Sequence, residues 1–472
     1  MTMGNVEAAG KELESALGKR RVLSDDFVLS SYTKDGTVFY YPLSLPSLVV
    51  LPYTTEEVQK IVQVANKYKI PVIPTGGRTS HWGAIDSNRG IVIDMCNMRN
   101  IIEIDEKNLT FTVQAGANVH HVSGDVLRKR GFCYPVHALN FAPISFGAEV
   151  AKNTGGEVGC MYGHVAKHIV GLEVVLGNGD ILITGSSRVI KNAPNFQQSG
   201  IPDLTQLFVA SEGALGVITE VTMRMSMVPV AEEGIDVRFE GTGTFNRVIS
   251  ACHEIRLKKI ARNAHLVDVY TDKKEYFHLF LLEIESLISQ EECDLKKKAA
   301  LEICKKHGGK YIGDEMAETT LPQTRGKEFL EKLVERQRGT IPMLGFADVP
   351  YEYVPKIHEK FLETLDRCDW PREKSNFVGA FGDESCLTFC ILQQNPNDNE
   401  GNLQKCKEVF GKVLKFYTEI GTIPYRIGRI WRPYILDKLD PSYLRYVRSL
   451  KREFDPNNIM NPGVSVFEEE YK

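Results

Sequence analysis

A glycine turn that directly follows a β-branched apolar run constrains this chain more than any other feature. Residues 71–84 read Pro-Val-Ile-Pro-Thr-Gly-Gly-Arg-Thr-Ser-His-Trp-Gly-Ala, so the strand expected at Val72 and Ile73 leads into Gly76 and Gly77. Glycine adopts positive φ without a Cβ clash, and the backbone N–H groups of such a turn can converge on one anion. A plain surface turn has the same composition, so the prediction of a phosphate site depends on the motifs that accompany it.

Four glycine-containing segments follow downstream, at residues 153–156, 162–164, 171–180 and 211–220. In this order and spacing they resemble the FAD-binding domain of the vanillyl-alcohol oxidase and p-cresol methylhydroxylase superfamily of flavoproteins. The likeness extends from about Pro46 to Val228 and resumes in the closing sequence 454–463, Phe-Asp-Pro-Asn-Asn-Ile-Met-Asn-Pro-Gly. The resemblance implies FAD as the cofactor.

The same resemblance implies which residues contact FAD. A Rossmann fingerprint is absent, because no Gly-x-Gly-x-x-Gly lies between an expected strand and an expected helix. Gly177-Asn178-Gly179 is instead typical of a hairpin turn. The pyrophosphate is expected at the first turn and the other contacts in the later segments. The expected cofactor-binding residues are Thr75, Gly76, Gly77, Arg78, Thr79, Ser80, Trp82, Ser145, Gly147, Asn153, Gly155, Gly156, Glu212, Gly213, Gly216, Ile218 and Asn461.

Non-covalent FAD is expected at this turn. Members that attach flavin here carry a histidine directly before the serine, whereas this chain has Thr79 before Ser80 and His81 after it. Attachment through a residue of the cap stays open.

Patterning predicts an α+β protein with four parts. Residues 1–45 form a lead-in with a helix at 6–17, residues 46–228 an FAD domain of two α+β subdomains, residues 229–424 a cap, and residues 425–472 a return to the FAD domain. In the cap, helical runs at 285–306 and 327–338 alternate with strands, which is typical of a sheet covered by helices on one side. The sequence contains no recognisable internal repeat.

Composition excludes several classes of partner. A formal charge of −4 with a pI near 6.3 gives no reason to expect nucleic acid or an anionic membrane surface. The chain has no run long enough to span a bilayer and no secretory signal, so a cytoplasmic location is expected. Its ten cysteines are scattered, which favours reduced thiols over disulfides or an iron–sulfur cluster. A small-molecule substrate is expected; the electron acceptor, oxygen or a redox protein, and a homo-oligomeric state stay open.

Two subgroups of the superfamily offer an active site. Oxidases of para-substituted phenols carry a Gly-Arg-Asn-Ser-Gly-Tyr-Gly-Gly turn and a late Tyr-Arg pair; this chain has residues 77–84 and Tyr425-Arg426. Arginine and a tyrosine hydroxyl stabilise a phenolate, which lets a benzylic hydride leave to flavin N5. We therefore expect catalytic roles for Tyr425, Arg426, His81 and Trp82, with a 4-hydroxybenzylic substrate.

The second subgroup comprises D-2-hydroxy-acid dehydrogenases of the D-lactate and glycolate type, in which histidines hold a metal near the substrate. The corresponding stretches here are 381–389 and 423–428, and no histidine occurs after His358. No metal site is expected, although the same arginine could hold a carboxylate without a metal. A third alternative, from another class, is an electron-transfer flavoprotein subunit of a larger complex.

Overall fold

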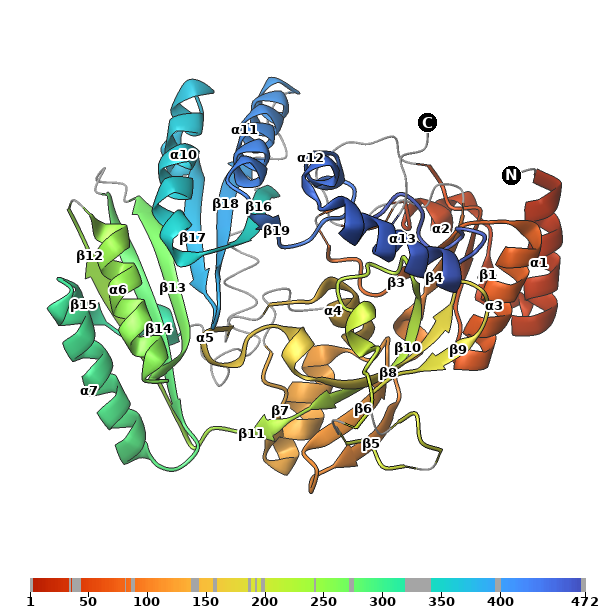
Figure 1. Ribbon diagram of the computed structural model, residues 1–472, viewed down its shortest axis with the longest axis horizontal. Coiled ribbons are helices and arrows are strands. Elements are labelled where there is room, and N and C mark those ends of the chain that lie inside the picture. The colour runs from red at the N-terminus through yellow and green to blue at the C-terminus, as the bar shows by residue number, and fades with distance from the viewer. Residues whose placement is uncertain are drawn as a thin grey trace.

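The computed structural model describes residues 3–33, 35, 44–80, 82–85, 90–136, 144–155, 159–185, 188–191, 193–196, 200–241, 243–270, 276–318, 341–394 and 400–467. Helices and sheets are mixed, and the sheets fall into two halves (Figure 1). The α+β class predicted from the sequence is confirmed.

The first sheet places the glycine turn. Its strands lie in the order β1 (Val22–Leu23), β2 (Leu48–Val50), β4 (Ile91–Asp94) and β3 (Val72–Thr75), with β2, β4 and β3 parallel. Helix α3 (Thr55–Tyr68) connects β2 to β3 and begins as predicted, because Thr54 Oγ1 accepts a hydrogen bond from the Glu57 N–H at 3.3 Å. Its apolar face packs against α1 (Met3–Leu17). The parallel arrangement brings the end of β3 directly into the turn at Gly76.

The second sheet is antiparallel and provides the opposite wall of the site. Its order is β5 (Ile101–Asp105), β6 (Thr110–Gln114), β10 (Gly216–Arg224), β8 (Ile169–Leu176) and β9 (Ile181–Ile183). The β8–β9 hairpin turns at residues 177–180, so Gly177-Asn178-Gly179 has the structural role predicted for it. Helix α4 (Phe146–Lys152) packs on β6 and β10. The smaller elements of this half are α2 (Asp26–Ser30), β7 (Phe132–Cys133), α5 (Gly159–Tyr162) and β11 (Ser226–Met227).

The cap contains an eight-stranded antiparallel sheet. Its order is β15 (Lys310–Gly313), β12 (Ala231–Phe239), β14 (Tyr276–Ser286), β13 (Ala261–Tyr270), β17 (Ser375–Phe381), β18 (Cys386–Gln394), β16 (Ile341–Val349) and β19 (Ile423–Pro424). Its helices are α6 (Thr244–Leu257), α7 (Gln290–Lys306), the short α8 (Glu315–Glu318), α10 (Val354–Arg367) and α11 (Glu400–Glu419). Residues 285–286, predicted as helix, instead end β14, where the apolar strand continues before Ser289 caps α7.

The cap repeats one topology twice, which the sequence did not reveal. The elements β12-α6-β13-β14-α7-β15 and β16-α10-β17-β18-α11-β19 follow the same order, and the two units meet where β13 pairs with β17. Only the alternation of strands and helices recurs, so comparison of residues along the chain finds no repeat. The predicted helix at 327–338 lies outside the described residues.

The cap sheet and the C-terminal segment both contact the first half of the molecule. Asp348 of β16 lies 3.9 Å from His164, and Glu285 of β14 accepts a hydrogen bond from Tyr162 of α5. After α12 (Arg432–Ile435) and α13 (Pro441–Phe454), the Asn461 N–H donates to the Val72 carbonyl at 2.8 Å. Lys451 of α13 donates to the Ala214 carbonyl at 2.7 Å. The C-terminal segment therefore returns to β3.

Candidate cofactor and substrate site

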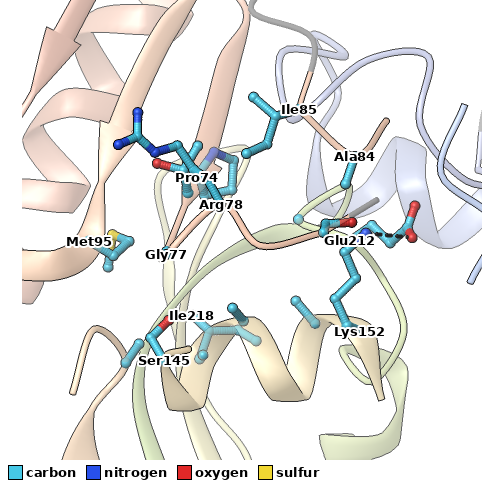
Figure 2. A pocket seen from close by; sticks show the side chains of 18 of the residues that line it. Pro74, Gly77, Arg78, Ala84, Ile85, Met95, Ser145, Lys152, Glu212 and Ile218 are labelled. Carbon is cyan, nitrogen blue, oxygen red and sulfur yellow. Dashed lines mark hydrogen bonds and ion pairs between the residues drawn. The ribbon is translucent and has the colours of Figure 1, made fainter. Parts of the chain in front are cut away.

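A cavity with about 920 Å³ of empty space, part of it open to solvent, lies between the two sheets of the first half. The turn after β3 lines one side, and α4 with the start of β10 lines the other. Arg426 and Asn461, from the last part of the chain, complete its lining. Figure 2 shows the glycine turn facing Ser145 and Ile218 across the cavity.

Glycine is needed at position 76 because the turn passes close to Ser145 and Ala148, and not because the backbone there takes a positive φ. A Cβ at this position would overlap Ser145 Oγ and lie 3.2 Å from the Ala148 Cβ. The residue of this turn that takes positive φ is Arg78, at 58°. The expectation that Gly76 uses its freedom to adopt positive φ is therefore wrong, and the glycine instead lets the turn and α4 share a narrow space.

Polar atoms on the cavity wall fit a ligand such as FAD. In the described part of the chain, Ser80 Oγ and Asn461 Oδ1 are buried and have no hydrogen-bond partner, although both residues line the cavity. Buried polar groups are normally paired, so these two atoms favour a ligand that pairs with them. The lining also includes apolar Ile85 and Ile218, as a flat aromatic ring system needs.

Arg78 directs its charge away from the cavity. Its Nη1 donates to the Ser31 carbonyl at 2.7 Å, and its guanidinium lies 4.0 Å from the Tyr32 ring centroid. The arginine of the predicted pyrophosphate turn thus ties that turn to the lead-in segment.

A buried ion pair stands at the end of α4. Lys152 Nζ lies 2.8 Å from Glu212 Oε1 (Figure 2). The Gly428 N–H donates to Glu212 Oε2 at 2.9 Å. Both ionic side chains line the cavity. The pair fixes the segment that carries Arg426 against the flavin-domain half.

Arg426 presents its charge among neutral hydroxyl groups. Its Nη2 donates to Thr154 Oγ1 at 3.1 Å and to the Tyr425 hydroxyl at 3.3 Å, and the Gly155 N–H also donates to that hydroxyl. No carboxylate of the described residues lies within 4.0 Å of the guanidinium, and its Nε is buried without a partner there. A half-buried cation held only by hydroxyl groups is suited to an anionic ligand.

Glu149 lies fully buried on α4, electrostatically linked to Arg426. Burial raises the pKa of its carboxyl to about 8, against the opposing effects of the Tyr134 hydroxyl and the Arg426 guanidinium. The group is therefore mostly protonated near neutral pH.

His164, from the first half of the molecule, and Asp348, from the cap, lie beside Tyr425 and Arg426. The His164 and Tyr425 ring centroids are 5.8 Å apart, and His164 Nε2 has no hydrogen-bond partner within the described residues. Removal of water raises the pKa of Asp348, while His164 and Arg426 oppose this effect. A histidine beside a carboxylate at this position is able to accept a substrate proton.

The structure brings most of the predicted residues to one cavity. Those that line it are Thr75, Gly76, Gly77, Arg78, Thr79, Ser80, Ser145, Gly147, Glu212, Gly213, Gly216, Ile218, Arg426 and Asn461. Tyr425 lies directly beside it, bonded to Arg426. His81 and Gly156 lie outside the described residues.

Three predicted residues stand apart from the lining within the part of the chain described. Trp82 is 1 % exposed and belongs to the core of the cap with Trp431, which leaves no surface to form a substrate wall. Asn153 ends α4 at φ 47°, and its Oδ1 accepts a hydrogen bond from the Ala166 N–H. Gly155 contacts Tyr425 rather than the cavity.

The sequence interpretation assigned no role to Lys152, Thr154, Glu149, His164 or Asp348. His164 stood in a quoted glycine segment, and Glu149 is a lone acid in the apolar stretch Phe146-Gly-Ala-Glu-Val-Ala, which was a usable signal for a buried ionisable group. Asp348 carried no signal, because only the tertiary structure brings β16 to His164.

The described residues contain neither a candidate metal cluster nor a helix that could cross a membrane. No cluster of three or more His, Cys, Asp or Glu side chains has an arrangement suited to a metal ion. Among the same residues, no helix has both the length and the apolar composition that a membrane crossing needs.

Two family models match the chain: an FAD binding domain at residues 46–185 and the FAD linked oxidases, C-terminal domain, at residues 260–464. The glycolate oxidase subunit GlcD of Bacillus subtilis is 28 % identical over 92 % of this chain and 91 % of its own length. D-2-hydroxyglutarate dehydrogenase of Stutzerimonas stutzeri is 29 % identical over 96 % and 97 %.

Solved structures share the fold. p-Cresol methylhydroxylase with substrate bound has a TM-score of 0.82 at 20 % identity, covering 98 % of this chain and 97 % of the other. 4-Ethylphenol oxidase from Gulosibacter chungangensis has a TM-score of 0.77 at 18 % identity, with the same coverage. The chain is an FAD-dependent oxidoreductase of the FAD linked oxidase family, with an FAD binding domain followed by the C-terminal domain of the FAD linked oxidases, and it shares the fold of p-cresol methylhydroxylase.

Proposed function

We propose that the chain oxidises a small substrate whose anionic oxygen is held by Arg426 and Tyr425. The observation that carries this proposal is the environment of Arg426, whose described hydrogen-bond partners at the cavity are hydroxyl groups alone. A half-buried guanidinium whose Nε is shielded from water, and which has no carboxylate partner among the described residues, costs free energy unless a ligand supplies the negative charge. A substrate carboxylate or phenolate would supply it.

A D-2-hydroxy acid is the leading substrate class. The sequence alone placed 4-hydroxybenzylic substrates first, but the relatives that match over nearly the whole chain are named as glycolate oxidase and D-2-hydroxyglutarate dehydrogenase. A carboxylate also fits the planar fork of Arg426 better than a single phenolate oxygen does. The absence of metal-ligating histidines after His358 means that, in this proposal, the arginine provides the positive charge.

The residues around the cavity divide the work of such a reaction. Bound FAD supplies the two-electron acceptor, and the cavity residues Ser80, Asn461 and the turn at Gly76 would hold it. Arg426 and Tyr425 orient the substrate carboxylate. Oxidation of the hydroxyl-bearing carbon releases the hydroxyl proton, and His164 Nε2 accepts it; Asp348, 3.9 Å away, stabilises the resulting positive ring.

A 4-hydroxybenzylic alcohol is the second candidate. The Tyr425 hydroxyl and one guanidinium nitrogen of Arg426 lie 3.3 Å apart. Both groups can therefore donate to one phenolate oxygen, which favours this substrate. In this case the phenolate activates the para carbon and no base is needed for the first step. Substitution His164→Asn separates the candidates, because only hydroxy-acid oxidation should slow strongly.

An anaerobic titration followed at the flavin absorbance tests the proposal. The panel contains D-lactate, L-lactate, glycolate, D-2-hydroxyglutarate and 4-hydroxybenzyl alcohol. We expect D-2-hydroxy acids, added in excess over the enzyme, to bleach the bound flavin. Bleaching by the phenolic alcohol alone moves that class to first place. Bound FAD that no member of the panel bleaches overturns the proposed substrates and favours an electron-transfer subunit.

A further inference from the structure

One row of side chains crosses the cap sheet and ends at the reaction site. Strand pairing sets Leu281 of β14 opposite His265 of β13, His265 opposite Ala380 of β17, Ala380 opposite Leu387 of β18, and Leu387 opposite Asp348 of β16. Direct cross-strand partners point to the same face of a sheet, with Cβ atoms about 4.5–5.5 Å apart. We call these five residues the cap row.

The cap row faces the first half of the molecule. Asp348, at its end, has a carboxyl oxygen 3.9 Å from His164 Nε2. Its neighbours along β16, Ala347 and Val349, point the other way and belong to the hydrophobic core of the cap. The side chains of His164 and Asp348 are 24 % and 30 % exposed, so the space beside them is open. Leu387 therefore comes next to Asp348 on the face that meets the reaction site.

The middle of the cap row is apolar and uncharged. Leu387 is 9 % exposed, and Ala380 is half-buried. His265, the next residue of the row, is also half-buried, and burial lowers the pKa of its imidazole to about 4, so the ring is neutral near pH 7. Such a surface favours an alkyl group over a carboxylate, because a carboxylate that loses its hydration without gaining a cation costs free energy.

Two cations near this end of the cap row already have partners. The hairpin at residues 382–385 leads directly into β18 and Leu387. Lys167 of the first half lies 3.2 Å from Glu384 of this hairpin and also pairs with Asp383. Arg256 of α6 donates from Nη1 to the Asp383 carbonyl at 2.6 Å. A second carboxylate on the substrate would have to compete with these partners for either cation.

We propose that Leu387 and Ala380 bind the group carried on C2 of the substrate and select an apolar group over a second carboxylate. With the first carboxylate on Arg426 and the hydroxyl at His164, the remaining substituent of C2 reaches the cap row beside Asp348. The preferred substrates are then D-2-hydroxy acids with an alkyl or aryl side chain, and a dicarboxylate such as D-2-hydroxyglutarate is disfavoured. This inference rests on the proposed function, because it requires that Arg426 hold the first carboxylate.

Two carboxylates of the same shape test the preference: glutarate, and 5-methylhexanoate, in which an isopropyl group replaces the second carboxylate. Neither has a hydroxyl group to be oxidised, and propionate serves as a short probe of the Arg426 end alone. Dissociation constants are measured on the FAD-loaded protein by the perturbation of the flavin absorbance. The wild type should bind 5-methylhexanoate about tenfold more tightly than glutarate, or better.

Variants of Leu387 should change this preference in opposite ways. Leu387→Lys places a cation in the cap row and should reverse the preference, so that glutarate binds about tenfold more tightly than 5-methylhexanoate. Leu387→Ala should weaken 5-methylhexanoate about tenfold and glutarate less than about twofold, because only an alkyl contact is lost. Leu295→Lys, at a leucine of α7 that is 67 % exposed, is the matched control and should behave as the wild type.

A variant on the neighbouring strand keeps the test decisive if Leu387→Lys fails to fold. Ala380→Leu adds bulk to the cap row and should weaken the binding of 5-methylhexanoate, while propionate, which is too short to reach the row, should bind as in the wild type. Equal binding of 5-methylhexanoate by Ala380→Leu and the wild type would place the C2 group elsewhere.

The outcomes separate this inference from the proposed function. If the wild type binds none of the three probes, or Arg426→Met binds propionate as tightly as the wild type, the proposed function fails. If Arg426 is required but both Leu387 variants keep the wild-type ratio of the two dissociation constants, the inference is overturned and the proposed function stands. A lower urea midpoint with that ratio unchanged would identify Leu387 as a purely structural residue. A wild type that prefers glutarate overturns the inference as well.

Discussion

Two arginines of this molecule, Arg262 buried and Arg426 half-buried, have opposite surroundings. Arg262 of β13 is 2 % exposed and pairs with three carboxylates: its Nε lies 3.2 Å from Glu283 Oε2, its Nη1 lies 3.0 Å from Glu285 Oε2, and Glu232 completes the set. Arg426 contacts hydroxyl groups of Thr154 and Tyr425 and no described carboxylate. One charge is neutralised within the protein, and the other is not.

The contrast distinguishes a structural cation from a ligand-binding one. Burial alone would lower the pKa of Arg262, but the three carboxylates hold it above its usual value. The Tyr162 hydroxyl of α5 also donates to Glu285, so this cluster joins the cap sheet to the first half. Arg426 stands at the cavity instead, and Glu149, a fully buried acid that interacts with it electrostatically, is mostly protonated near neutral pH. The contrast predicts that removing Arg262 affects stability and removing Arg426 affects chemistry.

The largest effect is expected from Arg262→Met. Loss of the arginine leaves Glu232, Glu283 and Glu285 buried without a cation, which costs about 3–5 kcal/mol of unfolding free energy. Urea denaturation measures this change. Arg130→Met removes an exposed pair with Glu106 and should cost less than about 1 kcal/mol. A loss of stability no larger in Arg262→Met than in Arg130→Met would show that the cluster does not stabilise the cap.

The second largest effect is expected from Arg426→Met, which should slow the reaction and leave stability unchanged. Flavin reduction by the preferred substrate should slow by about 10² or more, equivalent to at least about 2.7 kcal/mol, because a preorganised charge partner of the substrate is lost. FAD content and the urea midpoint should stay close to those of the wild type. Stopped-flow reduction and the flavin-to-protein absorbance ratio measure the two. A rate within a factor of about two of the wild type would place the substrate anion elsewhere and end the contrast.

The sequence indicated the residues around Arg426 and the cavity, but gave no sign of the cluster around Arg262. The glycine turn, the later FAD segments and the Tyr425-Arg426 pair are local motifs. Thirteen of the residues expected from these motifs line the cavity. They could be anticipated because residues close together in the sequence share one local geometry. Arg262 with its three glutamates, and His164 with Asp348, are brought together by strand pairing and by the cap over the first half. Contacts of this kind leave no periodic signal.

A smaller effect is expected from Tyr425→Phe. The hydroxyl accepts from Arg426 and from the Gly155 N–H, so its loss removes neutral hydrogen bonds and leaves the guanidinium charge in place. The cost should be about 0.5–1.5 kcal/mol in the reduction step, or up to about tenfold. The same stopped-flow assay measures it. An effect as large as that of Arg426→Met would mean that the phenol itself takes part in proton transfer and that the charge is not the dominant contribution.

The smallest effect is expected from removal of metal ions. If Arg426 supplies the positive charge for the substrate anion, no divalent cation is needed, and the described residues contain no His, Cys, Asp or Glu cluster suited to hold one. Prolonged dialysis against a chelator, followed by transfer to metal-free buffer, should leave the rate of flavin reduction unchanged within error. A loss of rate that zinc or manganese restores would show that a cation shares the task of Arg426, with Asp348 as the first carboxylate to test by Asp348→Asn. The two arginines would then differ in degree only, because a metal-bound substrate would not need the uncompensated guanidinium.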